Sequence, residues 1–380
     1  MSSPKILIID DSPINVVLIR GILETEGFEV IWAPDGPAGF AASRTEHPDL
    51  ILLDVIMPGE SGFDTCARLK SDEATSDIPI IFLSALDDVK SKVTGLKIGG
   101  VDYICKPVYR DEVLARVRVH LRIRETNRAL MEEQRIRLDR LRDAQQAILA
   151  NPDDIPEAKY AVYYEPLEET GGDFYDVVRL DSDVFGYFVA DVSGHGVSAS
   201  FVTSAIKALL RQYTGPLYSP EETMRGIGSV MREVLGQEQY LTACYARLNR
   251  RSNWLSVVSA GHPPAVVVDP AGQARTVEMD GDPLGLFSSV VLQRKDILLS
   301  GGERIYLYTD GIVESSPGAP RKAGLERLKS TCLQHAATPL SKATIEIAQE
   351  LRPTGGLQDD LLLLAVDVDS PNKAVRRPAA

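Results

Sequence analysis

Short runs of apolar residues alternate with amphipathic stretches over the first 120 residues. The apolar runs are about five residues long and lack the alternation of a strand with one solvated face, which is typical of parallel strands buried on both sides. The stretches between them have helical spacing, and the first begins at Ser12-Pro13, a common helix start. This order predicts an α/β domain of residues 1–120, a doubly wound five-stranded parallel sheet with helices on both faces. The expected strands are Lys5–Ile9, Phe28–Trp32, Asp49–Leu53, Pro79–Leu83 and Val101–Ile104.

The pattern changes from about residue 153 onward. Short strands broken by turn residues, such as Thr170-Gly171-Gly172, enclose paired stretches with helical spacing. This pattern predicts two packed sheets flanked by helices, an α/β/β/α sandwich, over residues 153–370. The expected strands are Tyr160–Glu165, Asp173–Leu180, Val184–Ala190, Leu241–Leu248, Trp254–Ala260, Ala265–Asp269, Val290–Leu292, Ile305–Thr309 and Leu361–Val366.

The segment between the two domains, residues 121–152, is predicted to be part of one long helix. From Arg110 to Ala150 the chain has no proline or glycine, and acidic and basic residues alternate. Apolar residues such as Leu130 and Leu138 lie on one side of this helix. Two interpretations stay open: a solvated spacer helix, or a parallel coiled coil that makes the protein a homodimer. We favour the coiled coil because an isolated helix of this length is poorly stable in water.

Length and composition narrow the class of protein. A chain of 380 residues is too long for one ordinary core, and its net charge of −13 argues against a nucleic-acid surface. No stretch approaches the roughly 20 apolar residues that span a membrane. The four cysteines form no metal-binding or redox spacing, so we expect a cytoplasmic protein. The polar tail, residues 371–380, is expected to be disordered.

Polar residues follow the apolar runs of the first domain. They are Asp10 and Asp11 after the first run, Asp54 after the third, Ser84 after the fourth and Lys106 after the fifth. Ligands of parallel sheets bind at the carboxyl ends of the strands, so we expect these side chains to meet there. Clustered carboxylates stay ionised together when a cation lies between them. Lys106 would add a counter-charge for a phosphoryl group, and Ser84 a hydroxyl donor.

These residues and their spacing resemble the receiver domain of two-component response regulators. The resemblance implies that a histidine kinase phosphorylates Asp54 in the presence of Mg²⁺. It also implies that charge added at Asp54 draws Ser84 and Tyr103 inward as a switch, and that Lys106 contacts the phosphoryl group. The implied Mg²⁺ ligands are Asp10, Asp11, Asp54 and the main-chain carbonyl of Ile56.

In the second domain, carboxylates lie at the ends of predicted strands beside glycine-rich or polar turns. The apolar run from Phe185 to Ala190 leads into Asp191-Val192-Ser193-Gly194-His195-Gly196. A single aspartate in such a turn more often caps the next helix. The pattern recurs, however, at Asp173, Asp310 and Asp359. If these strand ends converge at one rim, two divalent cations would neutralise the carboxylates and activate a water for attack on phosphorus, and Asp191 is the best candidate to bridge both cations.

Four motifs resemble those of protein phosphatase 2C-like enzymes, and the bacterial SpoIIE and RsbU type in particular. They are Gly171-Gly172-Asp173-Phe174, Asp191–Gly196, Tyr308-Thr309-Asp310-Gly311 and Gln358-Asp359-Asp360. The resemblance implies hydrolysis of phosphoserine or phosphothreonine on a protein, often an anti-sigma factor antagonist of the STAS fold. The implied ligands of two Mn²⁺ or Mg²⁺ ions are Asp173, Asp191, the Val192 carbonyl, Asp310 and Asp359.

Two features of this second region leave questions open. No counterpart of the phosphate-binding arginine of the eukaryotic branch is evident, so the orientation of the substrate has no explanation from the sequence. His195 is either an acid for the leaving serine or a residue that hydrogen-bonds the turn around it.

Two functions from different classes follow. The first is a response regulator whose output is a metal-dependent serine/threonine phosphoprotein phosphatase, controlled by phosphorylation of Asp54. The second is a non-catalytic adaptor that uses a phosphatase-like fold to sequester a partner protein. All four carboxylates of the second domain are present, which favours the enzyme.

Overall fold

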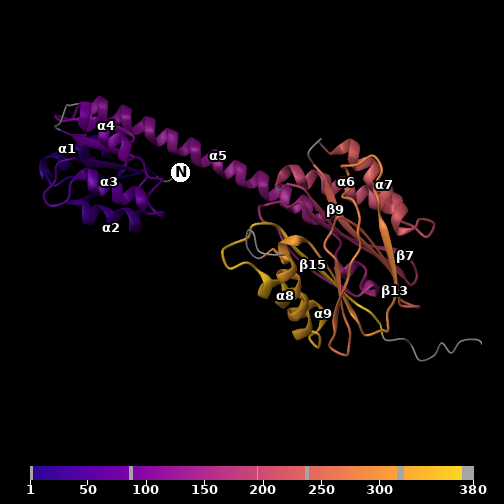
Figure 1. Cartoon of the computed structure of the whole chain (residues 1–380). Helices are drawn as coiled ribbons and strands as arrows, with labels where there is room; N and C mark the ends of the chain where they lie inside the picture. Colours follow the sequence, from indigo (N-terminus) through magenta and orange to yellow (C-terminus); the bar gives the residue numbers. More distant parts are fainter. Residues whose placement is uncertain (1–2, 85–88, 195, 236–238, 315–320, 370–380) are drawn as a thin grey trace, which may run out of the picture. The chain divides into compact units, whose positions relative to one another are not determined.

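The computed structural model describes residues 3–84, 89–194, 196–235, 239–314 and 321–369. The chain divides into two compact units, Met1–Arg135 and Ile136–Ala380 (Figure 1). One helix, α5 (Arg110–Ile148), begins in the first unit and ends in the second. Among the helices of the described ranges, none has an apolar stretch long enough to cross a membrane.

The first unit is a parallel sheet with helices on both faces, which confirms the sequence prediction. Its other elements are β1 (Lys5–Ile9), α1 (Pro13–Glu24), β2 (Glu29–Ala33), α2 (Gly36–Glu46), β3 (Leu50–Asp54), α3 (Gly62–Ser71), β4 (Ile80–Ser84), α4 (Val89–Ile98) and β5 (Asp102–Cys105). The strand order is β2-β1-β3-β4-β5. Ile6 and Ile8 of β1 pack with residues of α1 and α5, whereas Leu7 and Ile9 pack with residues of α3. Successive residues therefore enter different cores, which explains the continuous apolar runs.

The second unit consists of two antiparallel five-stranded sheets, ordered β13-β10-β9-β8-β7 and β12-β11-β14-β15-β6. The strands of the first sheet are β7 (Asp173–Asp181), β8 (Val184–Val192), β9 (Leu241–Asn249), β10 (Trp254–Ala260) and β13 (Gln293–Leu298). Those of the second sheet are β6 (Tyr160–Glu165), β11 (Ala265–Val268), β12 (Ala274–Val277), β14 (Arg304–Tyr308) and β15 (Leu361–Asp367). The helices are α6 (Val197–Tyr213), α7 (Pro220–Val234), α8 (Arg321–Gln334) and α9 (Leu340–Leu351).

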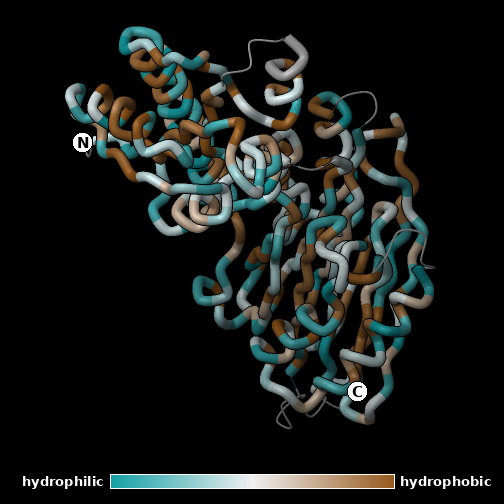
Figure 2. The backbone as a smooth tube through the Cα atoms, turned by 90° about the vertical axis from the view of Figure 1, so that its left-hand side faces the viewer, coloured by the Kyte–Doolittle hydropathy of each residue, from teal (hydrophilic) through white to brown (hydrophobic). Residues whose placement is uncertain are grey.

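Three cores hold the layers of the second unit together. Tyr187 of β8 and Leu307 of β14 belong to the core between the two sheets. The next residue of β8, Phe188, faces α6 and α7, and Tyr306 of β14 faces α8 and α9. Hydrophobic positions, drawn brown, recur along the strands of this unit (Figure 2). The layer order is thus helices, sheet, sheet, helices, which confirms the predicted sandwich.

Two edge strands of the second unit differ from the sequence prediction. The prediction of a strand at Val290–Leu292 is wrong, because β13 begins at Gln293. The sequence analysis also did not predict β12 (Ala274–Val277). Most residues of β13 are exposed and carry polar or charged side chains, as in Arg294 and Lys295. Edge strands that face water give no apolar pattern, so periodicity does not reveal them.

Candidate functional site

The β7–β8 hairpin brings two candidate aspartates together. Asp173, the first residue of β7, lies opposite Asp191 of β8 in the ladder. The chain before β7 passes close to the end of β8: a Cβ atom on Gly172 would lie 2.7 Å from the carbonyl oxygen of Val192. Only glycine fits at this distance, so the residues around Asp173 and Asp191 pack closely. We call this edge of the second unit, where Asp173 and Asp191 lie side by side, the rim.

The end of β14 adds a third aspartate to this rim. Thr309 follows β14, and its hydroxyl donates a 2.6 Å hydrogen bond to Asp173 Oδ2. The same hydroxyl accepts a hydrogen bond of 3.2 Å from the main-chain N–H of Leu362 in β15. Asp310 comes next and begins a short 3-10 helix, Asp310–Ile312. Thr309 therefore joins the two sheets at the point where Asp310 is presented.

Asp360 holds the rim in place, a role that the sequence did not reveal. Its carboxylate is buried and accepts hydrogen bonds from the main-chain N–H groups of Leu167 at 2.7 Å, Gly172 at 2.7 Å and Asp173 at 3.1 Å. Its neighbour Asp359 is exposed. The sequence shows two consecutive aspartates before an apolar strand, but this pattern does not tell which of the two side chains faces the interior.

Burial and mutual repulsion raise the pKa values of the rim aspartates. Burial, followed by the negative charges of Asp310, Asp359 and Asp360, raises the pKa of Asp191 to about 7. Burial and then the charge of Asp191 raise the pKa of Asp173 well above its ordinary value. Asp359 is open to solvent on one side, yet the surrounding protein desolvates its carboxyl and raises its pKa to about 6. Without a cation, the ionised carboxylates destabilise one another.

The donor set of the rim fits hard divalent cations. Carboxylate and main-chain carbonyl oxygens are the ligands that Mg²⁺ and Mn²⁺ take, and the rim offers both kinds. Three carboxylates with one oxygen each within 4.8 Å of one another occur, among the described residues, in the first unit alone. The rim aspartates are therefore more widely spread. A spread set suits two cations that each bind some of the carboxylates and share a water.

A cavity of about 530 Å³ lies beside Asp310. Gly261 and His262 from the loop after β10 line it, as does Arg321 at the start of α8. Arg321 donates hydrogen bonds of 3.1 Å to Asp310 Oδ2 and 2.6 Å to Glu314 Oε1. Asp310, a candidate metal ligand, thus forms part of the cavity wall, and so does the positively charged guanidinium of Arg321.

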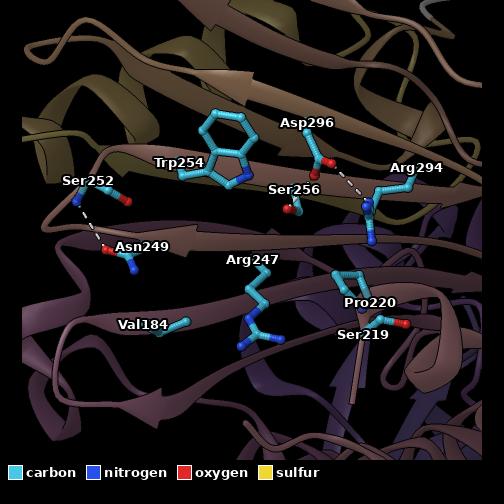
Figure 3. A pocket seen from close by; sticks show the side chains of 10 residues that line it. All are labelled: Val184, Ser219, Pro220, Arg247, Asn249, Ser252, Trp254, Ser256, Arg294 and Asp296. Carbon is cyan, nitrogen blue, oxygen red and sulfur yellow. Dashed lines mark hydrogen bonds and ion pairs between the residues drawn. The ribbon is translucent and has the colours of Figure 1, made fainter. Parts of the chain in front are cut away.

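A second pocket, of about 410 Å³, lies over β9, β10 and β13 (Figure 3). Trp254, Arg247 and Arg294 line it, and none of the rim aspartates does. Arg294 is paired with Asp296, as the dashed line in Figure 3 shows. This pocket is therefore separate from the carboxylate site.

The sequence has one histidine in the turn after Asp191 and another, His262, in the loop after β10. His195 lies outside the described residues. His262 is buried, and its Nδ1 shares a 2.9 Å hydrogen bond with the hydroxyl of Thr242, which lies opposite Asp191 in the ladder. Burial lowers the pKa of His262 to about 3, so this imidazole is neutral at pH 7 and supports the strand beside Asp191.

The first unit gathers its predicted polar residues at the carboxyl ends of the strands. Asp10, Asp11 and Asp54 each offer an oxygen within 4.8 Å of the others, which fits one Mg²⁺. Lys106 Nζ lies 2.9 Å from Asp10 Oδ2 and 2.6 Å from Asp54 Oδ2. Burial raises the pKa of Asp54, and the hydrogen bond from Lys106 opposes this effect. A buried carboxylate beside an ammonium group is suited to accept a phosphoryl group, because the cation offsets the added charge.

The other predicted residues of the first unit lie in β4, in β5 and in the loop after β3. Ser84 ends β4, the strand beside β3, and is buried. Tyr103 in β5 is 7% exposed, and its ring stacks on that of Phe82 with centroids 5.0 Å apart. The main-chain N–H of Ile56 donates a 3.3 Å hydrogen bond to Asp54 Oδ1.

Acidification is expected to stabilise the metal-free chain as the pH falls from about 7 to about 4. The folded chain keeps protons on Asp191 up to about pH 7 and on Asp359 up to about pH 6, whereas an unfolded aspartate loses its proton near pH 4. Between these pH values the folded state binds more protons than the unfolded state. The contribution of the two aspartates to the free energy of unfolding is therefore largest below about pH 4 and is lost as the pH rises to about 7. Thermal unfolding without metal, at about pH 5 and about pH 7, measures the effect.

The comparison for this prediction is Asp191→Asn. Removal of the carboxylate should reduce the gain in Tm on acidification and raise the Tm of the metal-free chain at neutral pH. Mn²⁺ should raise the Tm of the wild type at neutral pH and that of the variant by less. Equal pH dependence in the two proteins would contradict the repulsion at the rim.

The two units match two family models. Residues 6–118 match the response regulator receiver domain, and residues 181–369 match stage II sporulation protein E (SpoIIE). Protein PilH of Pseudomonas aeruginosa is 40% identical over 110 residues, which cover 29% of this chain and 91% of PilH. The chain spans about half, or about a quarter, of the length of other curated relatives that it matches.

Solved structures resemble the second unit. The RsbU and RsbW domains of Rv1364c from Mycobacterium tuberculosis align with a TM-score of 0.51 and 30% identity, over 56% of this chain and 60% of that one. The SiaA-PP2C domain of Pseudomonas aeruginosa aligns with a TM-score of 0.56 and 22% identity, over 63% of this chain and 99% of that one, and shows the fold. The chain belongs to the response regulator family, and its output domain is a SpoIIE-type domain with the PP2C-like phosphatase fold.

Proposed function

We propose that this response regulator is a metal-dependent serine/threonine phosphoprotein phosphatase, controlled by phosphorylation of Asp54. The observation that carries the proposal is the rim of the second unit. There Asp173, Asp191, Asp310 and Asp359 lie close enough for charge on one to raise the pKa of another. Hydrolysis of a phosphate ester at neutral pH needs an activated water and charge stabilisation, and this rim can hold the cations that provide both.

Each rim residue has a proposed part in this chemistry. Two Mn²⁺ or Mg²⁺ ions, when bound, would supply the activated water. Asp191 is the proposed shared ligand, since it lies beside Asp173 in the sheet and interacts with Asp310 and Asp359. The Val192 carbonyl lies against the same turn. Thr309 and Asp360 hold Asp173 by hydrogen bonds to its carboxylate and its main-chain N–H.

The proposed substrate is a phosphorylated STAS-fold protein of the anti-sigma factor antagonist type. The motifs support this substrate class, and so does the likeness at 30% identity to a structure that contains an RsbU domain. The test is release of inorganic phosphate from a serine-phosphorylated STAS protein by the full chain in Mn²⁺, with and without EDTA. Metal-dependent release supports the proposal. No release in any divalent metal would contradict it.

The adaptor remains the competing proposal, and metal binding separates the two. A sequestering protein needs the fold but no ions, whereas hydrolysis needs both. Calorimetry with Mn²⁺ should show binding to the second unit that is lost in Asp173→Asn and retained in Asp11→Asn. Absence of any binding that depends on Asp173 would favour the adaptor.

The proposed input is phosphotransfer from a histidine kinase to Asp54, with Mg²⁺ held by Asp10, Asp11, Asp54 and the Ile56 carbonyl. The geometry of Lys106 around Asp54 supports this proposal. We also propose that α5 pairs with α5 of a second copy. Val119, Ile123 and Leu130 of this helix are about half exposed, which favours a partner over a solvated spacer. Light scattering of the full chain should give the mass of a dimer, and a monomer mass would contradict the pairing.

The last turn of α5 contacts the loop that presents Asp173. Gln145 is buried, its Nε2 donates a 2.7 Å hydrogen bond to the Gly171 carbonyl, and its Oε1 accepts one of 3.2 Å from the Gly171 N–H. Gly171 is two residues from Asp173. A change in α5 that moves Gln145 would therefore move a proposed metal ligand, which gives the linker helix a physical route to the active site.

We expect Gln145→Ala to make the phosphatase activity of the second unit independent of phosphorylation at Asp54. The variant loses two hydrogen bonds to a buried peptide group, which should lower the free energy of unfolding by about 1–3 kcal/mol. It should also bring the ratio of phosphatase rates with and without an acyl-phosphate donor close to one. Phosphate release and thermal unfolding measure the two effects. The control is Gln146→Ala, since Gln146 is the next residue and is exposed; a wild-type ratio in Gln145→Ala would contradict the route.

A further inference from the structure

The cavity beside Asp310 is the place where a substrate can meet the metal site. Its walls come from the loop of residues 261–264, from the end of β14 and from α8. Four charged side chains line it besides Asp310: Glu278, Arg321, Lys322 and Glu326. The glutamates repel an anion, whereas Arg321 and Lys322 attract it, so an anionic group in this cavity would bind closest to these two cationic side chains. The volume of about 530 Å³ is large enough for a phosphorylated side chain with part of its backbone.

Arg321 is the cation that contacts the metal site. Its guanidinium lies 3.1 Å from Asp310 Oδ2 and pairs with Glu314, and 70% of its side chain is exposed. An exposed ion pair of this kind contributes little stability, so it exchanges easily. Lys322 lines the same cavity, but the described part of the chain shows no hydrogen bond between Lys322 and Asp310.

We propose that Arg321 binds the phosphoryl group of the phosphoprotein substrate and of the inorganic phosphate product; this inference rests on the proposed phosphatase function. In the metal-loaded enzyme the carboxylate of Asp310 would bind a cation, and its ion pair with Arg321 would be weaker. The planar guanidinium then faces the adjacent phosphoryl group, whose oxygens match its paired N–H donors. Arg321 is thus a substrate-binding residue at a position where the sequence offered no candidate.

The test compares the wild type with Arg321→Gln and Arg321→Lys in the full chain. Calorimetry with inorganic phosphate on the Mn²⁺-loaded protein should show affinity about 10- to 100-fold weaker in Arg321→Gln, as expected for loss of a charge-assisted pair. Arg321→Lys should recover part of the lost affinity, because lysine keeps the positive charge but lacks the paired N–H donors of the guanidinium. For the phosphoprotein, KM should rise more than kcat falls. Mn²⁺ should bind Arg321→Gln at least as tightly as the wild type, since Asp310 has lost a competing partner.

The matched control is Arg327→Gln, which makes the same change on an exposed arginine of the same helix, away from the cavity. It should retain wild-type affinity for phosphate. Phosphate affinity in Arg321→Gln equal to that of the wild type would overturn the inference while leaving the phosphatase intact. A wild type that binds Mn²⁺ and phosphate but releases no phosphate from any phosphoprotein would overturn the function instead, and the phosphate titration would still decide the part of Arg321.

Discussion

Asp191→Asn is expected to lower phosphoprotein hydrolysis by at least about a thousandfold, because it removes the proposed ligand shared by two cations. Asp191 lies opposite Asp173 in the sheet, and burial followed by the charges of Asp310 and Asp359 raises its pKa. Burial and then the charge of Asp191 in turn raise the pKa of Asp173, so Asp191 interacts with all three of the other proposed ligands. An amide binds a hard cation more weakly than a carboxylate does, and the water between the cations would lose its activation. Initial rates of phosphate release in Mn²⁺ measure the loss.

The control for this prediction is Asp181→Asn, at the opposite end of the same strand pair. Asp181 is exposed and accepts a hydrogen bond from the N–H of Ser182, which an asparagine oxygen can also accept. This variant should keep wild-type activity. Asp191→Asn should stay folded, since it loses a repelling charge rather than an apolar contact. Hydrolysis by folded Asp191→Asn at the wild-type rate would refute the assignment of the metal site.

Periodicity revealed the fold and the strand ends because both depend on local patterns. The run from Phe185 to Ala190 is apolar because β8 is buried by α6 and α7 on one face and by the second sheet on the other. Such a run must end where the chain turns to solvent, and Asp191 marks that point. The same reasoning placed Asp10 directly after the buried strand β1 and Asp54 at the end of the buried strand β3. It missed β13, whose exposed residues carry no such signal.

The contacts that hold the site are long-range, and sequence patterns do not contain them. Asp360 accepts a hydrogen bond from Gly172, which lies 188 residues earlier in the chain, and nothing in the local sequence distinguishes its role from that of Asp359. Gln145 resembles other polar residues of α5 until the fold buries it against Gly171. Arg321 gains its significance from its distance to Asp310. In each case the chemistry is that of an ordinary polar side chain, and only the tertiary structure selects it.

An acyl-phosphate donor with Mg²⁺ is expected to phosphorylate the wild type and to leave Asp54→Asn unmodified. Asp54 is 5% exposed, and Lys106 lies 2.6 Å from its Oδ2. Asp10 and Asp11 lie close enough to share a cation with it, so both the nucleophile and the charge compensation are in place. Asparagine has no anionic oxygen to attack phosphorus, so the loss should be complete. Intact mass spectrometry after incubation detects the added phosphoryl group.

The control is Asp64→Asn, which removes an exposed carboxylate from the first turn of α3 in the same unit. It should be phosphorylated as fully as the wild type. The donor should also change the rate of phosphoprotein hydrolysis in the wild type and in Asp64→Asn, and leave the rate of Asp54→Asn unchanged. A phosphoryl group on Asp54→Asn would place the acceptor on another side chain. If the acyl-phosphate donor still changed the rate of hydrolysis in Asp54→Asn, Asp54 would not control the phosphatase activity, because the charge added at that carboxylate is the proposed signal.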